Sequence, residues 1–235
     1  MIRVVMAWLA HLYTALGLVC VAGIVVLIVR GDDASFRWAF GLMMVATAID
    51  ATDGWFARAA NVHEVLPQFD GAALDNLIDF HTYTSLPLFL LWRAGLFPGA
   101  FAWLLLLPLL ASAYGFSQVN AKTDDGFFLG FPSYWNIVAV YLYVLQATPV
   151  IAAAIVILFA VLTFVPTHYI YASKGGPFAL VINGGSAVWF FVLAAILSRP
   201  AGSARALAWI SMVYPLLYLV LSGVVTLRKR SGLTA

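Results

Sequence analysis

Carboxylates in apolar surroundings are the residues of this sequence best placed to do chemistry. The chain has 10 acidic residues, and four of them lie in or against long apolar stretches: Asp50, Asp53, Asp75 and Asp79. An aspartate at the centre of a bilayer costs about 2.5–3.5 kcal/mol on insertion scales, so this carboxylate set needs a compensating charge. Arg58 is the nearest fixed cation, and one arginine cannot neutralise the whole set. Since carboxylate oxygens are ligands that Mg²⁺ and Mn²⁺ prefer, we expect bound divalent metal.

The spacing of the carboxylate set predicts two helices that each present a pair of aspartates. Asp50 and Asp53 are three positions apart, and Asp75 and Asp79 are four apart, so each pair shares one helix face. Small residues accompany them: Gly54, Ala57, Gly71 and Ala72. These leave room for close helix approach or for a ligand.

The elements that must position these pairs are membrane helices. Of the 235 residues, 64% are hydrophobic and 9% are charged, whereas a soluble domain is about 25% charged. This composition excludes a soluble enzyme, a disordered protein and an ordinary nucleic-acid binder. We expect one domain over residues 1–235, an all-α integral membrane protein with about eight transmembrane helices. The predicted spans are 8–29, 36–56, 71–92, 98–119, 132–146, 149–171, 178–197 and 206–227.

The charges at the chain ends predict an orientation. An even number of spans places both termini on one side, and the basic run at 228–230 indicates that this side is cytoplasmic. We expect 8–29 to be a retained helix rather than a cleaved signal peptide. The carboxylate set then lies at the cytoplasmic end of the bundle, and Asp32 and Asp33 lie on the far side.

A family resemblance follows from the same residues. Residues 50–79 read Asp50-x-x-Asp53-Gly54-x-x-Ala57-Arg58, then twelve residues, then Gly71-x-x-x-Asp75-x-x-x-Asp79. This pattern resembles the signature of the CDP-alcohol phosphotransferase family. The twelve-residue gap, the chain length and the segment 11–17 are similar to the family's bacterial phosphatidylcholine-forming subgroup.

The resemblance implies a fold, a reaction and a set of roles. It implies a homodimer in the bacterial inner membrane that transfers the phosphatidyl group of CDP-diacylglycerol to choline and releases CMP. The carboxylate set would hold two divalent metals, Mg²⁺ or Mn²⁺, and Asp79 would also take the proton of the acceptor hydroxyl. Nucleotide contacts would come from Asp53, Gly54, Ala57, Arg58, Gly71 and Asp75.

The residues themselves favour a cationic acceptor. An anionic acceptor calls for clustered arginine and lysine, and the predicted cytoplasmic side offers Arg58, Lys122 and Lys174 near the bundle. Aromatic residues make up 15% of the chain, and a quaternary ammonium binds well to aromatic faces with a carboxylate, which favours choline. Candidate contacts to the acceptor or the lipid phosphate are Asn120, Lys122, Tyr83, Tyr134 and Trp135.

Three alternatives stay open. The acceptor could be serine, glycerol phosphate or inositol phosphate. The donor could be CDP-choline with diacylglycerol as acceptor, because the same motif serves both. In a different class, the carboxylate set could line the pathway of a cation transporter.

Overall fold

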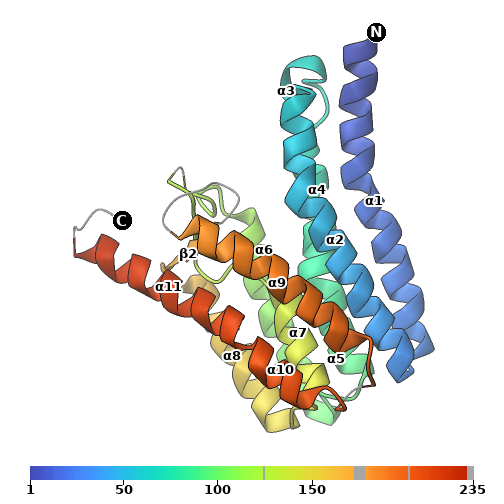
Figure 1. Ribbon diagram of the computed structural model, residues 1–235, viewed down its shortest axis with the longest axis vertical. Helices are drawn as coiled ribbons and strands as arrows, with labels where there is room; N and C mark the ends of the chain where they lie inside the picture. Colours follow the sequence, from blue (N-terminus) through green and yellow to red (C-terminus); the bar gives the residue numbers. More distant parts are fainter. Residues whose placement is uncertain (124, 172–177, 201, 232–235) are drawn as a thin grey trace.

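Helices form most of the chain. The computed structural model describes residues 1–123, 125–171, 178–200 and 202–231. Figure 1 shows α1, α2 and α4 rising together at the end that carries the short α3, while α9 and α11 cross the remaining helices. The helices are α1 (Ile2–Arg30), α2 (Asp33–Ala59), α3 (Val62–Val65), α4 (Gly71–Asp79), η1 (Phe80–Ser85), α5 (Leu86–Arg93), η2 (Gly99–Leu105), α6 (Leu106–Ser117), α7 (Trp135–Val144), α8 (Pro149–Phe164), α9 (Ala179–Leu197), α10 (Arg205–Ser211) and α11 (Val213–Arg230).

Each of the predicted spans overlaps helical structure, and within the described residues four helical segments are long and apolar enough to cross a membrane. They are Ile2–Arg30, Gly99–Ser117, Leu180–Leu197 and Arg205–Arg230. The helix α7 has 10 residues and α8 has 16. At the α-helical rise they measure about 15 and 24 Å, less than the hydrocarbon core of about 30 Å. The four long apolar segments support a membrane-embedded helical protein.

The third predicted span is continuous from Gly71 to Arg93, but its middle is a wide π-helical turn. In η1 the Leu86 amide donates to the His81 carbonyl, five residues back. Pro87 follows immediately, and it has no amide to donate and crowds the carbonyl four residues earlier. Such wide turns are frequent at functional sites, and this one begins directly after Asp79.

The expectation of a purely helical chain is wrong at one place. Two short antiparallel strands, β1 (Phe127–Leu129) and β2 (His168–Ile170), pair with Phe128 opposite Tyr169. The predicted span 149–171 therefore extends too far, because α8 ends at Phe164 and Val165 is extended. Pro166 explains this end, since a proline drives the residue before it out of the helical region.

The outer edge of β2 is closed by the last helix. The amides of His168 and Ile170 donate to the hydroxyls of Thr226 and Ser222 at 2.8 and 3.3 Å. Backbone donors left unpaired in a low-dielectric region are costly. The hydroxyls of α11 thus fix the strand pair to the bundle.

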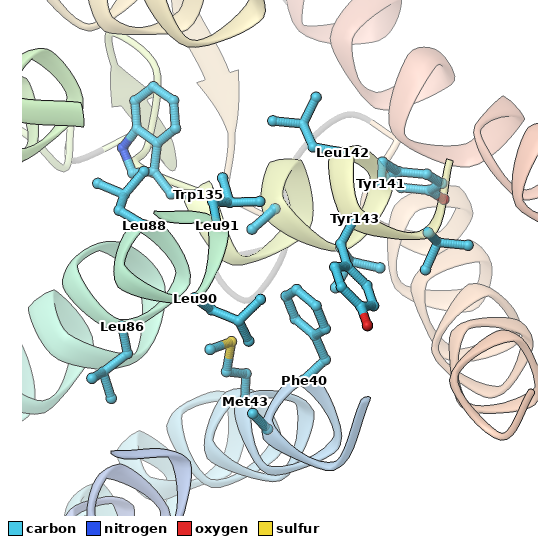
Figure 2. Packing of buried hydrophobic residues seen from close by; sticks show 14 of the residues in the cluster. Phe40, Met43, Leu86, Leu88, Leu90, Leu91, Trp135, Tyr141, Leu142 and Tyr143 are labelled. Carbon is cyan, nitrogen blue, oxygen red and sulfur yellow. The ribbon is translucent and has the colours of Figure 1, made fainter. Parts of the chain in front are cut away.

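The hydrophobic core lies where α2, α5 and α7 meet. Figure 2 shows Phe40 and Met43 of α2 facing Leu90 of α5, with Tyr143 of α7 beside them. The Phe40 and Tyr143 rings are 5.6 Å apart. This core fixes α2 against the α4–α5 segment, and it therefore sets how the two aspartate pairs face each other.

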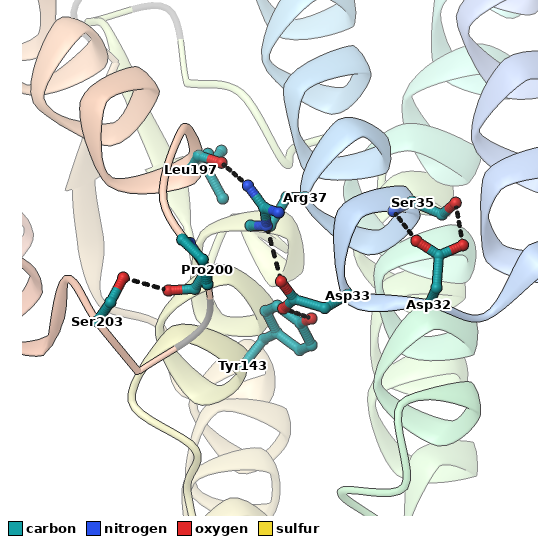
Figure 3. A network of polar contacts seen from close by, with 8 residues as sticks. All are labelled: Asp32, Asp33, Ser35, Arg37, Tyr143, Leu197, Pro200 and Ser203. Atoms are coloured by element: carbon teal, nitrogen blue, oxygen red, sulfur yellow. Dashed lines mark hydrogen bonds and ion pairs between the residues drawn. The ribbon is translucent and has the colours of Figure 1, made fainter.

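A polar network closes the opposite end of α2 (Figure 3). Asp32 accepts the Ser35 amide at 2.9 Å and the Ser35 hydroxyl at 2.6 Å, which caps the helix and lowers the pKa of the Asp32 carboxyl. Asp33 accepts from Arg37 at 2.9 Å and from the Tyr143 hydroxyl at 2.6 Å. Asp33 precedes Asp50 by about 26 Å along the helix, so this network holds the bundle together at a distance from the carboxylate set.

Candidate active site

Three of the four predicted metal ligands converge. Carboxylate oxygens of Asp50 on α2 and of Asp75 and Asp79 on α4 all lie within 4.8 Å of one another. Within the described residues, none of the carboxylate set pairs with a lysine or arginine. Hard oxygen ligands gathered this closely without a direct ion pair to a cationic side chain have the donor chemistry of a divalent metal site.

Asp53 has a different surrounding from the other three. It is 7% exposed and accepts a hydrogen bond from the Thr14 hydroxyl of α1 at 2.8 Å. At the preceding residue of α1, the Tyr13 hydroxyl lies 2.8 Å from the Thr52 hydroxyl. The first helix is thus part of the site, which the spacing of the acids alone did not predict.

A tyrosine fixes Asp50. The Tyr83 hydroxyl donates to Asp50 Oδ2 at 2.7 Å across the gap between η1 and α2. Tyr83 is 8% exposed, so the bond is largely shielded from water. A hydrogen bond to a carboxylate is about twice as strong as one between neutral groups, and it orients the oxygen that accepts it.

Two glycines let α1 approach α4. A Cβ added at Gly17 would lie 2.6 Å from Ile78 Cγ2, and one added at Gly71 would lie 2.6 Å from His11 Cε1. The His11 ring is buried and packs on the Phe69 ring at 4.5 Å. The predicted room around Gly71 is therefore filled by α1 itself, and this close contact brings Thr14 within reach of Asp53.

One cavity of about 400 Å³ opens beside the carboxylates. Its charged lining residues are Asp50, Asp53, Asp75, Arg58 and Lys122. Its apolar lining includes Phe40, Met43, Met44, Val140, Trp189, Phe190 and Leu193 of α2, α7 and α9. A space lined by both charged and apolar residues matches a molecule with a charged headgroup and an apolar tail.

The sequence-predicted contacts divide between this cavity and the rest of the molecule. Gly54, Arg58, Lys122, Tyr83 and Tyr134 line the cavity. Neither Ala57 nor Gly71 is among its lining residues, and Asp79 lies beside it through its contact with Asp50 and Asp75.

Two predicted acceptor contacts are elsewhere. Trp135 is fully buried in the core and donates from Nε1 to the Ser112 hydroxyl at 2.8 Å. The aromatic side chain that the sequence suggested for the acceptor therefore packs between α6 and α7. Asn120 is exposed and does not line the cavity. Lys174 lies outside the described residues.

Lys122 reaches the cavity from the loop in front of the strand pair. The backbone of Lys122 forms an isolated antiparallel β-bridge with Phe128. The Lys122 ammonium lies 5.7 Å from the centre of the Tyr171 ring. Nearby, Asp125 pairs with Lys229 of α11. The Lys229 ammonium and the Thr123 hydroxyl lower the pKa of the Asp125 carboxyl, so this contact stays charged at neutral pH. The loop that carries Lys122 is thus attached to the last helix.

Comparison with known proteins places the chain in a family. No family model matches it. It is 41% identical to a phosphatidylcholine synthase of Legionella bozemanae over 59% of this chain and 65% of that protein. The same name belongs to proteins of Legionella pneumophila, at 38% identity over 72% and 66% of the two chains, and of Pseudomonas aeruginosa, at 34% over 78% and 76%.

The extent of these matches differs among the relatives. The match spans about two thirds of the two Legionella proteins, 65% and 66% of their lengths, and about three quarters of the Pseudomonas protein, 76% of its length. With more than 30% identity over that larger share, the chain belongs to the phosphatidylcholine synthase family.

Proposed function

We propose that this protein transfers the phosphatidyl group of CDP-diacylglycerol to choline, with release of CMP. The observation that carries the proposal is that Asp50, Asp53 and Asp75 line one cavity together with apolar residues, while Asp79 clusters with Asp50 and Asp75 beside it. The names of its relatives support the same reaction.

The carboxylate set fits two divalent ions, Mg²⁺ or Mn²⁺. Asp50, Asp75 and Asp79 supply the clustered oxygens, and Asp53 lines the same cavity with its carboxylate held by Thr14. When bound, the metal supplies Lewis-acid neutralisation of the diphosphate and of the leaving phosphate. Thr14 and Tyr83 each hold one carboxylate oxygen in place, on Asp53 and Asp50 respectively.

The remaining residues of the motif hold the nucleotide and the phosphates. Gly54 has no side chain, and the Arg58 guanidinium passes close to the Cβ position that Gly54 leaves open. Arg58 and Lys122 are the cations of the cavity, and a guanidinium and an ammonium are the groups that bind phosphate oxygens. We assign the nucleotide contacts to Gly54, Ala57, Arg58 and Gly71 together with Asp53 and Asp75.

Asp79 is proposed to act as the base. The choline hydroxyl gives its proton to the Asp79 carboxylate as the oxygen attacks the lipid-side phosphorus. A new phosphoester bond forms, the bond from that phosphorus to the bridging oxygen breaks, and CMP leaves with the bonding electrons. Atoms and charge balance without any further reactant.

The arrangement in the membrane follows the same proposal. We propose eight crossings, with α7 and α8 as short members of the bundle, a single domain over the whole chain, and both termini in the cytoplasm. The cavity then opens to the cytoplasm for CMP and choline. A homodimer in the bacterial inner membrane, implied by the family resemblance, stays a prediction.

The test pairs donors with acceptors. Purified protein with Mn²⁺ is given CDP-diacylglycerol with choline, serine, glycerol phosphate or inositol phosphate, and separately CDP-choline with diacylglycerol. We expect CMP release from one pair only, CDP-diacylglycerol with choline. If CMP is released from a different pair and not from this one, the assignment is refuted. If the protein reconstituted in liposomes transports cations without nucleotide, and releases no CMP, the transporter alternative is favoured.

One variant tests the role of Asp79 as the base, and a second serves as its control. Asp79→Asn should fold and release no CMP, because the amide cannot take the proton. Asp32→Asn changes an aspartate at the far end of α2 and keeps a capping side chain, so it should behave as wild type. Near-normal turnover by Asp79→Asn would remove the assignment.

A further inference from the structure

Three tyrosines from separate parts of the chain form one wall of the cavity. Tyr83 comes from η1, Tyr134 precedes α7, and Tyr218 lies on α11, and all three line the cavity. The Tyr83 and Tyr134 ring centres are 6.1 Å apart, and those of Tyr134 and Tyr218 are also 6.1 Å apart. The planes are tilted by 44° and 56°, so the rings meet at angles instead of stacking flat.

The two outer rings are held by their hydroxyl groups. Tyr83 donates to Asp50 at 2.7 Å, and Tyr218 donates to the Ile170 carbonyl of β2 at 3.2 Å. Tyr218 also stacks on Tyr169 at 6.4 Å between ring centres. Because these hydroxyl tips are engaged, their rings are fixed before a ligand arrives, and little side-chain entropy is lost on binding.

The charges around this tyrosine wall select the ligand. Asp50 lies at one end of it, at the Tyr83 hydroxyl. Among the described lining residues the cations are Arg58 and Lys122, and the Lys122 ammonium lies over a different ring, that of Tyr171. A trimethylammonium group cannot donate a hydrogen bond, and it is recognised by aromatic faces with an anion nearby. The carboxylate of serine or the phosphate of a phosphorylated acceptor calls for cationic donors, whereas this wall presents aromatic faces with Asp50 at one end.

We propose that Tyr83, Tyr134 and Tyr218 form the acceptor subsite and contact the trimethylammonium group of choline. Tyr218 is the specificity-determining residue contributed by α11, a helix beyond the signature motif. This inference rests on the proposed function and names the residues that choose its acceptor.

The experiment compares Tyr218→Leu with Tyr218→Phe. Loss of the ring should raise the KM for choline about 5- to 30-fold, the range expected for a desolvated cation–π contact, with the KM for CDP-diacylglycerol unchanged. Phenylalanine keeps the aromatic face, so Tyr218→Phe should stay within about 3-fold of wild type. Tyr134→Leu provides a second ring deletion in case Tyr218→Leu does not fold. Tyr114→Leu is the matched control, because Tyr114 packs on Phe164 outside the cavity.

An uncharged analogue separates recognition of the cation from recognition of shape. The choline analogue 3,3-dimethylbutan-1-ol replaces the trimethylammonium group by a tert-butyl group. Wild type should bind it more weakly than choline, and the difference should shrink in Tyr218→Leu while it persists in Tyr218→Phe. Equal losses for both molecules would indicate a general packing defect and overturn the subsite.

A direct measurement of choline binding tests the subsite independently of the reaction. Choline affinity is measured by calorimetry on the purified protein with Mn²⁺ and CMP. Binding by wild type and Tyr218→Phe with loss in Tyr218→Leu supports the subsite, even if CDP-diacylglycerol proves to be the wrong donor. Absence of choline binding by wild type, or equal affinity in Tyr218→Leu, overturns it.

Discussion

The hydrogen bond from Thr14 to Asp53 provides a sharp test of how the first helix contributes to the site. Replacing Thr14 by valine keeps the shape of the side chain but removes the donor 2.8 Å from Asp53 Oδ2. A hydrogen bond to a charged group contributes about 1.5–3 kcal/mol, which corresponds to roughly 10- to 150-fold in an equilibrium constant. We expect Thr14→Val to raise the Mn²⁺ concentration that gives half-maximal CMP release by a factor in this range.

The assay is a Mn²⁺ titration of CMP release at saturating donor and choline. Thr14→Ser keeps the hydroxyl, so it should restore most of the metal affinity. Thr52→Val is the control, because the Thr52 hydroxyl bonds to Tyr13 and to its own helix backbone instead of to a carboxylate. An unchanged Mn²⁺ midpoint in Thr14→Val, with the fold intact, would refute the role assigned to α1.

Further variants test the other contacts. Tyr83→Phe removes the donor to Asp50 but keeps the ring, so metal affinity should fall about 10-fold or more while the KM for choline stays near wild type; a raised choline KM with unchanged metal binding would contradict this separation. Gly17→Val places a side chain 2.6 Å from Ile78 and should destabilise the protein by about 1–3 kcal/mol, read as a lower thermal midpoint in detergent, whereas an unchanged midpoint would show that the helices can separate freely. Asp70→Ala removes the cap that accepts the Ala73 amide at 2.9 Å and should cost about 1 kcal/mol; Asp70→Asn should recover most of it, and failure to do so would exclude capping as the cause.

The signature residues made the centre of the site predictable, because their spacing fixes a helix face regardless of the rest of the fold. The convergence of Asp50 with Asp75 and Asp79 follows from that spacing once two apolar helices are expected. Which helix supports Asp53 did not follow, since a single threonine in the apolar α1 carries no periodic signal. Tyr218 was missed for a similar reason: aromatic residues are common in membrane helices, and only the packing of α11 against β2 brings this one to the cavity.

Two differences have local causes. Trp135 was expected near the acceptor, yet aromatic residues fill cores and cavities alike, and its indole is satisfied by Ser112 in the core. The strand pair was not predicted because each strand is only three residues long, too short to show an alternating pattern. Pro166 marks the end of α8 in the sequence, but the partner of the following segment is set by contacts about forty residues away in the chain.

The most direct test of the central claim is a count of Mn²⁺ ions bound to the purified protein, measured by the electron paramagnetic resonance signal of the free ion. With CDP-diacylglycerol present, wild type should bind two Mn²⁺ ions per chain, and the double variant Asp50→Asn/Asp75→Asn should lose this binding while remaining folded. Undiminished Mn²⁺ binding in the double variant, or CMP release by wild type with no bound metal, would contradict the account.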